Sequence, residues 1–99
     1  MKLISINPAT NGKNKYTAIF DIDGRKRTTH FGASGMMDFI KYSKENKEIA
    51  AERRKAYIAR HGNESWTDPT KAGTLSRYIL WEYPSLTRAI SEYKQKYNL

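Results

Sequence analysis

The residues in this sequence whose type and spacing are best suited to binding a ligand are basic side chains. They are Lys13, Lys15, Arg25, Lys26, Arg27, Arg53, Arg54, Lys55 and Arg60. We call residues 25–27 the hairpin cluster, and residues 53–55 with Arg60 the helix cluster. A guanidinium group can hold a phosphate through two hydrogen bonds at once, which a merely solubilising charge does not require. The sequence therefore predicts a nucleic-acid-binding surface built from phosphate contacts.

The helix cluster also allows a structural interpretation. Arg53 and Arg60 are seven positions apart, so they share a side of a helix. That side also carries Ile49 and Ala56, so the aliphatic stems of the arginines could lie over the core instead. Whether the hairpin and helix clusters form one surface is left open by the sequence.

Net charge favours a polyanionic partner. Lys and Arg number 18 against 10 acidic residues, which gives a net charge of +8. Residues 1–61 hold 13 basic and 6 acidic residues, whereas residues 62–99 hold 5 and 4. A positive half joined to a nearly neutral half suggests a charged surface carried on a separate packing unit.

The paired carboxylates of Asp21 and Asp23 are the strongest hint of catalysis. An Asp-x-Asp-Gly sequence after an apolar strand resembles the opening of haloacid-dehalogenase phosphatases, where one carboxylate attacks phosphorus. That fold needs about twice this length and a further cluster around magnesium. Arg25 and Arg27 also exclude a calcium loop, since they occupy positions that need oxygen ligands. We therefore expect a hairpin turn here.

No other constellation predicts a reaction. His30 and His61 are the only histidines, and neither has metal-ligand spacing or a nucleophile beside it. The glutamates at 45, 48 and 52 alternate with lysines, as a solvated helix face does. We expect no enzymatic activity, no catalytic residue, no metal and no cofactor.

Four aromatic side chains could either stack on bases or fill the core. They are Trp66, Tyr78, Trp81 and Tyr83. Base stacking on aromatic rings is common in single-strand binding. The core is favoured, because Tyr78 and Trp81 fall in an apolar run.

Length and composition fit one domain, residues 1–99, with a β-rich part (1–35) and a helical part (43–98). There is no cysteine, which excludes disulfides and favours a reducing compartment. The beginning of the chain is too short and polar for a signal peptide, and no apolar run could span a bilayer. We expect a soluble protein of the cell interior with no membrane partner.

Predicted strands and helices position the basic residues, and the strands come first in the chain. Residues 2–6 predict a short strand that Asn7-Pro8 ends. Residues 16–22 and 25–31 predict a β-hairpin around Asp23-Gly24, a pair that tolerates positive φ. This turn pairs Phe20 with Arg27 and Tyr16 with Phe31. It places Tyr16, Ala18, Phe20, Thr29 and Phe31 on the buried face.

Helices follow. One is predicted from Lys44 or Asn46 to Arg60, with Ser43 as a candidate N-cap and Gly62 as the stop. Thr67 or Asp68 caps the next, with Pro69 in its first turn. Ser85 caps the last, whose apolar stripe is Leu86, Ala89, Ile90, Tyr93 and Tyr97. Residues 36–40 form an apolar patch of undetermined conformation.

A resemblance to a known protein family suggests the biological setting of this chain. It is carried by His30-Phe31-Gly32-Ala33, Tyr57-Ile58-Ala59-Arg60-His61, Trp66-x-Asp68-Pro69 with Ala72-Gly73, residues 75–81, and Pro84-Ser85-Leu86. With these motifs the chain resembles a family of small basic proteins of nucleocytoplasmic large DNA viruses, over roughly residues 14–97. One departure is the apolar stretch 36–40, where a more polar one is expected. The resemblance implies a viral setting and no mechanism.

These observations predict an α+β domain, in which a small N-terminal antiparallel sheet (a β-hairpin plus a short strand) packs on about three C-terminal helices. The predicted function is nonenzymatic nucleic-acid binding in a virion- or replication-associated protein, with DNA favoured over RNA. Such a protein would lie in the cytoplasm or nucleus of the host cell, or in the virion. The alternative is a minor structural protein of the virion that docks on other proteins through an exposed apolar patch of residues 36, 37, 39 and 40.

Overall fold

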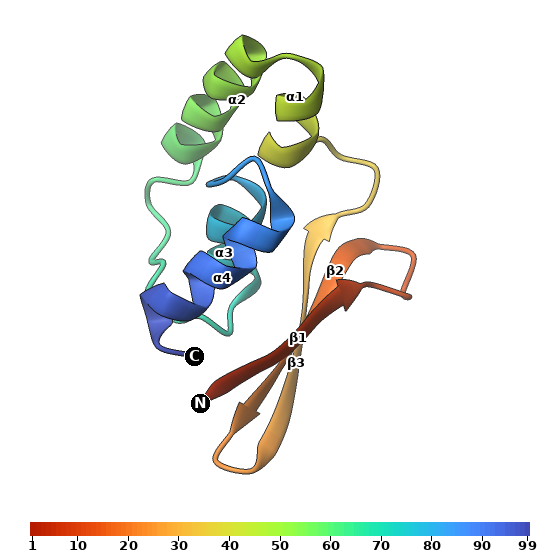
Figure 1. Ribbon diagram of the computed structural model, residues 1–99, viewed down its shortest axis with the longest axis vertical. Helices are drawn as coiled ribbons and strands as arrows, with labels where there is room; N and C mark the ends of the chain where they lie inside the picture. Colours follow the sequence, from red (N-terminus) through yellow and green to blue (C-terminus); the bar gives the residue numbers. More distant parts are fainter.

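The computed structural model describes all residues, 1–99. The chain opens with a three-stranded antiparallel sheet in the order β1-β2-β3, which consists of β1 (Lys2–Pro8), β2 (Asn14–Ile22) and β3 (Arg25–Ala33). Four helical segments follow, among them α1 (Phe39–Glu45) and α2 (Lys47–Arg60), which form a pair away from the hairpin turn (Figure 1). The predicted α+β class is confirmed, with one more helical element than expected.

The β2–β3 turn has the geometry expected of Asp23-Gly24. Both residues take positive φ, 52° and 83°, as a tight hairpin turn requires. Phe20 consequently pairs with Arg27, and Tyr16 with Phe31, which confirms the predicted register.

One face of the hairpin forms one side of the hydrophobic core. Ala18, Phe20 and Phe31 are fully buried, and Leu3 of β1 joins them. Between Leu3 and Ser5 the β1–β2 register shifts by a bulge, which leaves Ile4 exposed. β1 is longer than predicted, because Pro8 ends the ladder opposite Tyr16 on an edge strand, where a missing N–H is tolerated.

The apolar patch of residues 36–40, whose conformation the sequence leaves undetermined, contains the start of a helix. Asp38 caps α1 (Phe39–Glu45), and its Oδ1 accepts a hydrogen bond from the Lys41 backbone N–H at 2.9 Å. Asn46 then ends α1 and caps α2 (Lys47–Arg60), its Oδ1 accepting from the N–H groups of Glu48 and Ile49. The predicted N-cap at Ser43 is therefore wrong, because Ser43 lies inside α1 and the turn passes through Asn46.

The third helix starts later than the sequence suggests. Asp68 accepts hydrogen bonds from the backbone N–H and the hydroxyl of Thr70, so it closes a local turn rather than capping a helix. Helix α3 (Ala72–Leu75) begins after Lys71, and Pro69 lies outside it. It continues into a π-helical turn, η1 (Ser76–Leu80). The helix is wider there than an α-helix, and hydrophobic periodicity does not predict this change.

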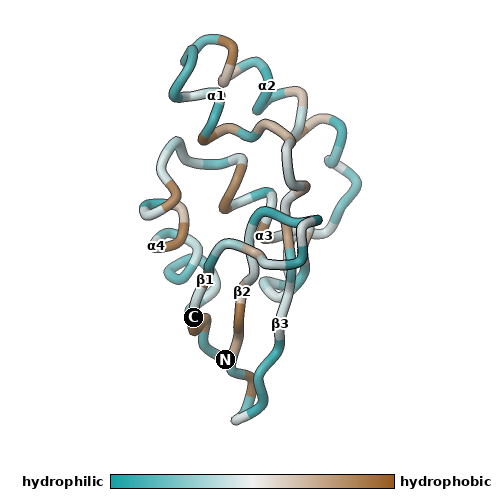
Figure 2. The backbone as a smooth tube through the Cα atoms, turned by 90° about the vertical axis from the view of Figure 1, so that its right-hand side faces the viewer, coloured by the Kyte–Doolittle hydropathy of each residue, from teal (hydrophilic) through white to brown (hydrophobic).

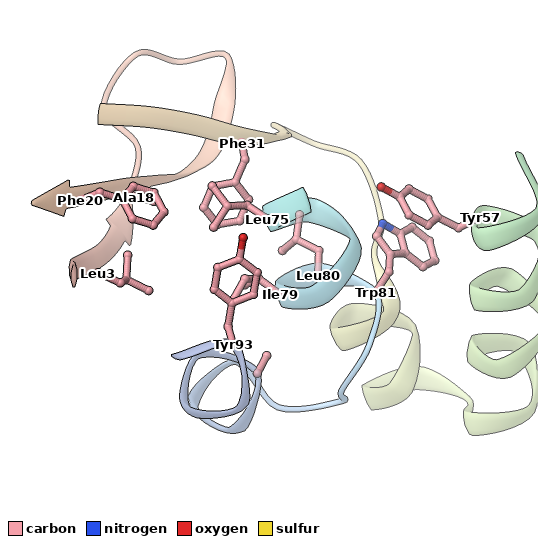
Figure 3. Close-up of a cluster of buried hydrophobic side chains, with 11 residues drawn as sticks. Leu3, Ala18, Phe20, Phe31, Tyr57, Leu75, Ile79, Leu80, Trp81 and Tyr93 are labelled. Carbon is pink, nitrogen blue, oxygen red and sulfur yellow. The ribbon is translucent and has the colours of Figure 1, made fainter. Parts of the chain in front are cut away.

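Helix α4 (Leu86–Tyr97) matches its prediction, with Ser85 as N-cap. Ala89 and Tyr93 on its apolar stripe are buried. They meet Leu75, Ile79 and Leu80 of the α3–η1 segment above the sheet (Figure 3). The core is thus a layer of helix over one face of the sheet.

The α1–α2 pair joins this core at its edge. Tyr57 of α2 stacks on Trp81 with ring centroids 4.5 Å apart and planes 7° apart. Figure 3 shows this pair beside the main group of side chains. None of the helices combines the length and the apolarity needed to cross a membrane.

Gly32 provides a test of how tightly the sheet packs on η1. Its φ is +76°, and an added Cβ would lie 2.8 Å from Leu80 Cδ1 and 3.2 Å from Lys15 Cβ. Gly12 has a similar φ of +72° but open space around it. We expect Gly12→Ala to cost about 1 kcal/mol from backbone strain alone. Gly32→Ala should cost about 1–3 kcal/mol more because of overpacking. Denaturant unfolding of both variants measures the difference, and equal losses would contradict the packing described here.

Candidate functional site

The hairpin cluster lies beside two carboxylates. Lys26 is paired in register with Asp21, and Asp23 occupies the turn itself. Residues 21–27 therefore carry three basic and two acidic side chains, a net charge of only +1. All three basic side chains are exposed. The hairpin tip is a weak positive patch.

The helical end carries more charge. Residues 39–60 hold seven Lys and Arg against three Glu, a net charge of +4. Arg53, Lys55 and Arg60 are exposed and form no ion pair. Residues 39–60 therefore carry more net positive charge than the hairpin tip.

The two clusters do not form one surface. In both views of the molecule, the β2–β3 turn lies at one end and the α1–α2 pair at the other (Figures 1 and 2). The longest extent of the molecule is 43 Å, several times the Debye length of about 8 Å at physiological salt. The clusters consequently act as separate patches.

Lys15 is not free to bind phosphate. Its side chain is only 9% exposed, and its ammonium lies 2.6 Å from Asp38 Oδ2. The prediction that Lys15 belongs to a phosphate-binding surface does not fit this geometry, because the pair with Asp38 already satisfies its charge. Lys13, in the β1–β2 loop, is exposed.

Arg54 is engaged within the fold as well. Its Nε donates to the Trp81 carbonyl at 2.9 Å, and its Nη2 donates to Glu82 Oε2 at 2.6 Å. Arg77, which is almost fully buried, donates to the same Glu82 oxygen at 2.6 Å. We call these three side chains the Glu82 network. It holds α2 against the segment after η1. Arg54 is therefore not available to bind phosphate.

The Glu82 network changes the acidity of its carboxylate. Burial raises the pKa of Glu82, but hydrogen bonds and positive charge from Arg77 and Arg54 more than offset this effect. The pKa of Glu82 therefore lies below its ordinary value of 4.5. The carboxylate stays ionised at neutral pH and holds both guanidinium groups.

A groove lies beside the exposed arginines of α2. Two hollows of about 300 Å³ each share Met36, Met37, Arg60 and Trp81 as lining, so they lie side by side. We call them together the Met–Trp groove. Arg53 lines one of its two parts. The seven-residue spacing of Arg53 and Arg60 thus places both on one side of α2, as predicted.

Three aromatic side chains, Tyr42, Tyr57 and Trp81, form part of the walls of the Met–Trp groove. Trp81 stacks on Tyr57, and burial together with the nearby Glu64 raises the pKa of the Tyr57 phenol to about 12. The Arg53 guanidinium lies 5.9 Å from the ring centroid of Tyr42. Trp81 is buried, as the core interpretation predicted, yet its remaining exposed edge lines both hollows.

The predicted apolar docking patch is not formed. Met36 is 62% exposed, but Ile40 is buried and Phe39 packs against the core under the Arg54 guanidinium. The other exposed large apolar side chains are Met1, Ile4 and Ile49. The patch fails because Asp38 starts a helix, which turns residues 39 and 40 inward.

A second pocket, of about 410 Å³, lies between η1 and α4. Tyr78, Tyr83 and Tyr93 line it together with Glu82 and Glu92. The Lys96 ammonium lies 4.7 Å from the centroid of the Tyr78 ring, so a cation of the chain already occupies its aromatic edge.

The remaining polar candidates have local roles. Asp21 accepts a hydrogen bond from the Gly24 N–H at the hairpin turn, and His30 Nδ1 is 2.8 Å from the Thr17 hydroxyl on the outer sheet face. His61 forms a hydrogen bond with Glu64. No group of three or more His, Cys, Asp or Glu side chains is placed to hold a metal ion.

Neither the Met–Trp groove nor the Glu82 network is predicted by the sequence. Their members come from the β3–α1 loop, α2 and the end of η1, which only the fold brings together. A signal existed for the network, since Arg77 interrupts the apolar run 75–81 and an acidic residue follows that run. Burial of an arginine requires such a partner.

Comparison with known proteins adds no relationship: no family model, no curated protein and no solved structure matches the chain.

The Glu82 network predicts a pH-dependent stability. Because the folded pKa of Glu82 is lowered, its contribution is full above pH 4.5 and disappears as the pH falls through the lowered pKa. We expect Glu82→Gln to cost about 1.5–3 kcal/mol at neutral pH. The cost should shrink in acid, where the protonated glutamic acid resembles glutamine.

Denaturant unfolding at neutral and acidic pH measures this effect. Glu92→Gln is the matched control, since Glu92 lies on α4 and forms no ion pair. Equal stability of the two variants at neutral pH would show that the network does not stabilise the fold.

Proposed function

We propose that this protein binds nucleic acid through phosphate contacts made by the exposed arginines of α2. The observation that carries the proposal is the pair Arg53 and Arg60. Both are exposed, neither forms an ion pair, and both line the Met–Trp groove. Free guanidinium groups on one side of a helix can each displace a counterion from a polyanion.

The charge of the whole molecule supports a polyanionic ligand. Of 18 Lys and Arg side chains, only Lys15, Arg54 and Arg77 form ion pairs. The other cations raise the local concentration of a polyanion around the molecule, and α1 and α2 carry the largest share. The hairpin cluster, at the opposite end and beside Asp21 and Asp23, contributes only to this general attraction.

The biological setting of the proposal rests on the family resemblance. A small basic protein of a nucleocytoplasmic large DNA virus would act in the infected cell or in the virion, and the DNA genome of such a virus makes DNA the favoured ligand. We propose a nonenzymatic, virion- or replication-associated role. The docking alternative has less support, because Phe39 and Ile40 of its predicted apolar patch face the core while Met36 is exposed.

Salt dependence of binding tests the proposal. We expect the logarithm of the association constant to fall linearly with the logarithm of salt concentration between about 50 and 200 mM. The double variant Arg53→Gln/Arg60→Gln should lower the slope by about 1.4 to 1.8, which corresponds to two lost phosphate contacts. Fluorescence anisotropy of a labelled DNA oligonucleotide measures the slope.

The matched control is Arg25→Gln/Arg27→Gln, which removes the same charge from the hairpin cluster. We expect it to change the slope by less than half as much. A larger effect of the control would move the interface to the hairpin. Absence of binding by the unmodified protein at low salt would refute the proposed function.

A further inference from the structure

The Met–Trp groove has a size and position that the phosphate contacts alone do not explain. Arg60 lines both of its hollows, of about 300 Å³ each, and Arg53 lines one of them. Volumes from about 300 Å³ upward are typical of pockets that hold small molecules or parts of them. The groove is therefore large enough to receive a chemical group attached to the phosphates that the arginines would bind.

The chemistry of the groove indicates which kind of chemical group it can bind. Thioethers of Met36 and Met37 and the edge of Trp81 offer an apolar, polarizable wall. The one carboxylate in the lining, Asp38, is neutralised by Lys15. A ligand that fits must present a flat apolar surface together with negative charge, which is the chemistry of a nucleotide.

The larger pocket between η1 and α4 lacks this combination. It contains Glu82 and Glu92, and Lys96 already lies over one of its rings. Glu82 is already compensated by Arg54 and Arg77, so this pocket offers an anionic ligand one cation, Lys96, beside the unpaired carboxylate of Glu92, whereas the Met–Trp groove offers two free arginines. The Met–Trp groove is thus distinguished by charge and not by volume.

We propose that the Met–Trp groove binds an unstacked base of single-stranded nucleic acid, while Arg53 and Arg60 hold the neighbouring phosphates. This inference rests on the proposed function and specifies its ligand. In a duplex the bases are stacked and paired, so their flat faces are unavailable to a side pocket. A single strand can turn one base into the groove without that cost, and stacking on protein side chains tolerates any base.

A comparison of two oligomers with equal charge tests the base site. One is oligothymidylate of about 12 nucleotides, and the other has the same sugar–phosphate chain without bases. Their phosphates contribute equally, so a difference in affinity reports the base. We expect the abasic oligomer to bind about tenfold more weakly.

The position of the base can be followed in the unmodified protein. The chain has three methionines, and Met1 lies outside the groove. With 13C-labelled methionine methyl groups, oligothymidylate should shift the Met36 and Met37 signals through the ring current of the base. The Met1 signal should stay in place, and the abasic oligomer should leave all three nearly unchanged.

A variant pair checks the site without disturbing the core. Met36→Glu places a carboxylate in the groove, and Ile4→Glu makes the same change on the exposed β1 bulge. Met36 and Ile4 are 62% and 48% exposed, so both variants should fold, which circular dichroism verifies. We expect about tenfold weaker binding of oligothymidylate by Met36→Glu. The change for Ile4→Glu should be about twofold or less, because salt screens a distant charge.

The outcomes separate the two proposals. Equal binding of both oligomers, with unmoved Met36 and Met37 signals, would overturn the base site and leave phosphate binding intact. Failure of both oligomers to bind at low salt would overturn phosphate binding itself.

Discussion

The two helices that carry the free arginines are held to the rest of the molecule by one joint. At this joint Tyr57 of α2 stacks on Trp81, while Arg54 donates to the Trp81 carbonyl and to Glu82. Arg77 reaches the same carboxylate from η1. The stack removes apolar surface from water, and the shared carboxylate compensates two guanidinium charges that would otherwise be costly to enclose. This joint fixes α2 against the segment after η1 and so helps to form the Met–Trp groove.

A second ion pair fixes the opposite wall of that groove. Asp38 caps α1 through one oxygen and accepts from the Lys15 ammonium through the other. This arrangement ties the β3–α1 loop, with Met36 and Met37, to β2. Buried Lys15 of the sheet and Arg54 of α2 are thus both used for structure. In the sequence each of them stands among similar cations. What distinguishes them from Arg53 and Arg60 is only whether a carboxylate lies within reach.

The distribution of the remaining charge decides what kind of ligand the molecule can attract. The hairpin tip mixes basic and acidic side chains, whereas the helical end has a net charge of +4 before Arg54 is paired. Exposed charges farther apart than a Debye length act almost independently at physiological salt. The molecule is therefore better described as having one principal positive end than as a uniformly basic surface. The principal end is also the one with an apolar depression beside its cations.

The sequence by itself determined the elements whose signals are local. The Asp23-Gly24 pair set the hairpin register, since only a tight turn with two positive φ values fits between those strands, and Ser85 with the stripe from Leu86 to Tyr97 set α4. Only the tertiary structure decided that Lys15 and Arg54 are paired, and that Met36, Arg60 and Trp81 share a groove. The physical reason is range: turn geometry and helical periodicity act between neighbours along the chain, whereas ion pairs and grooves depend on residues that meet only after folding.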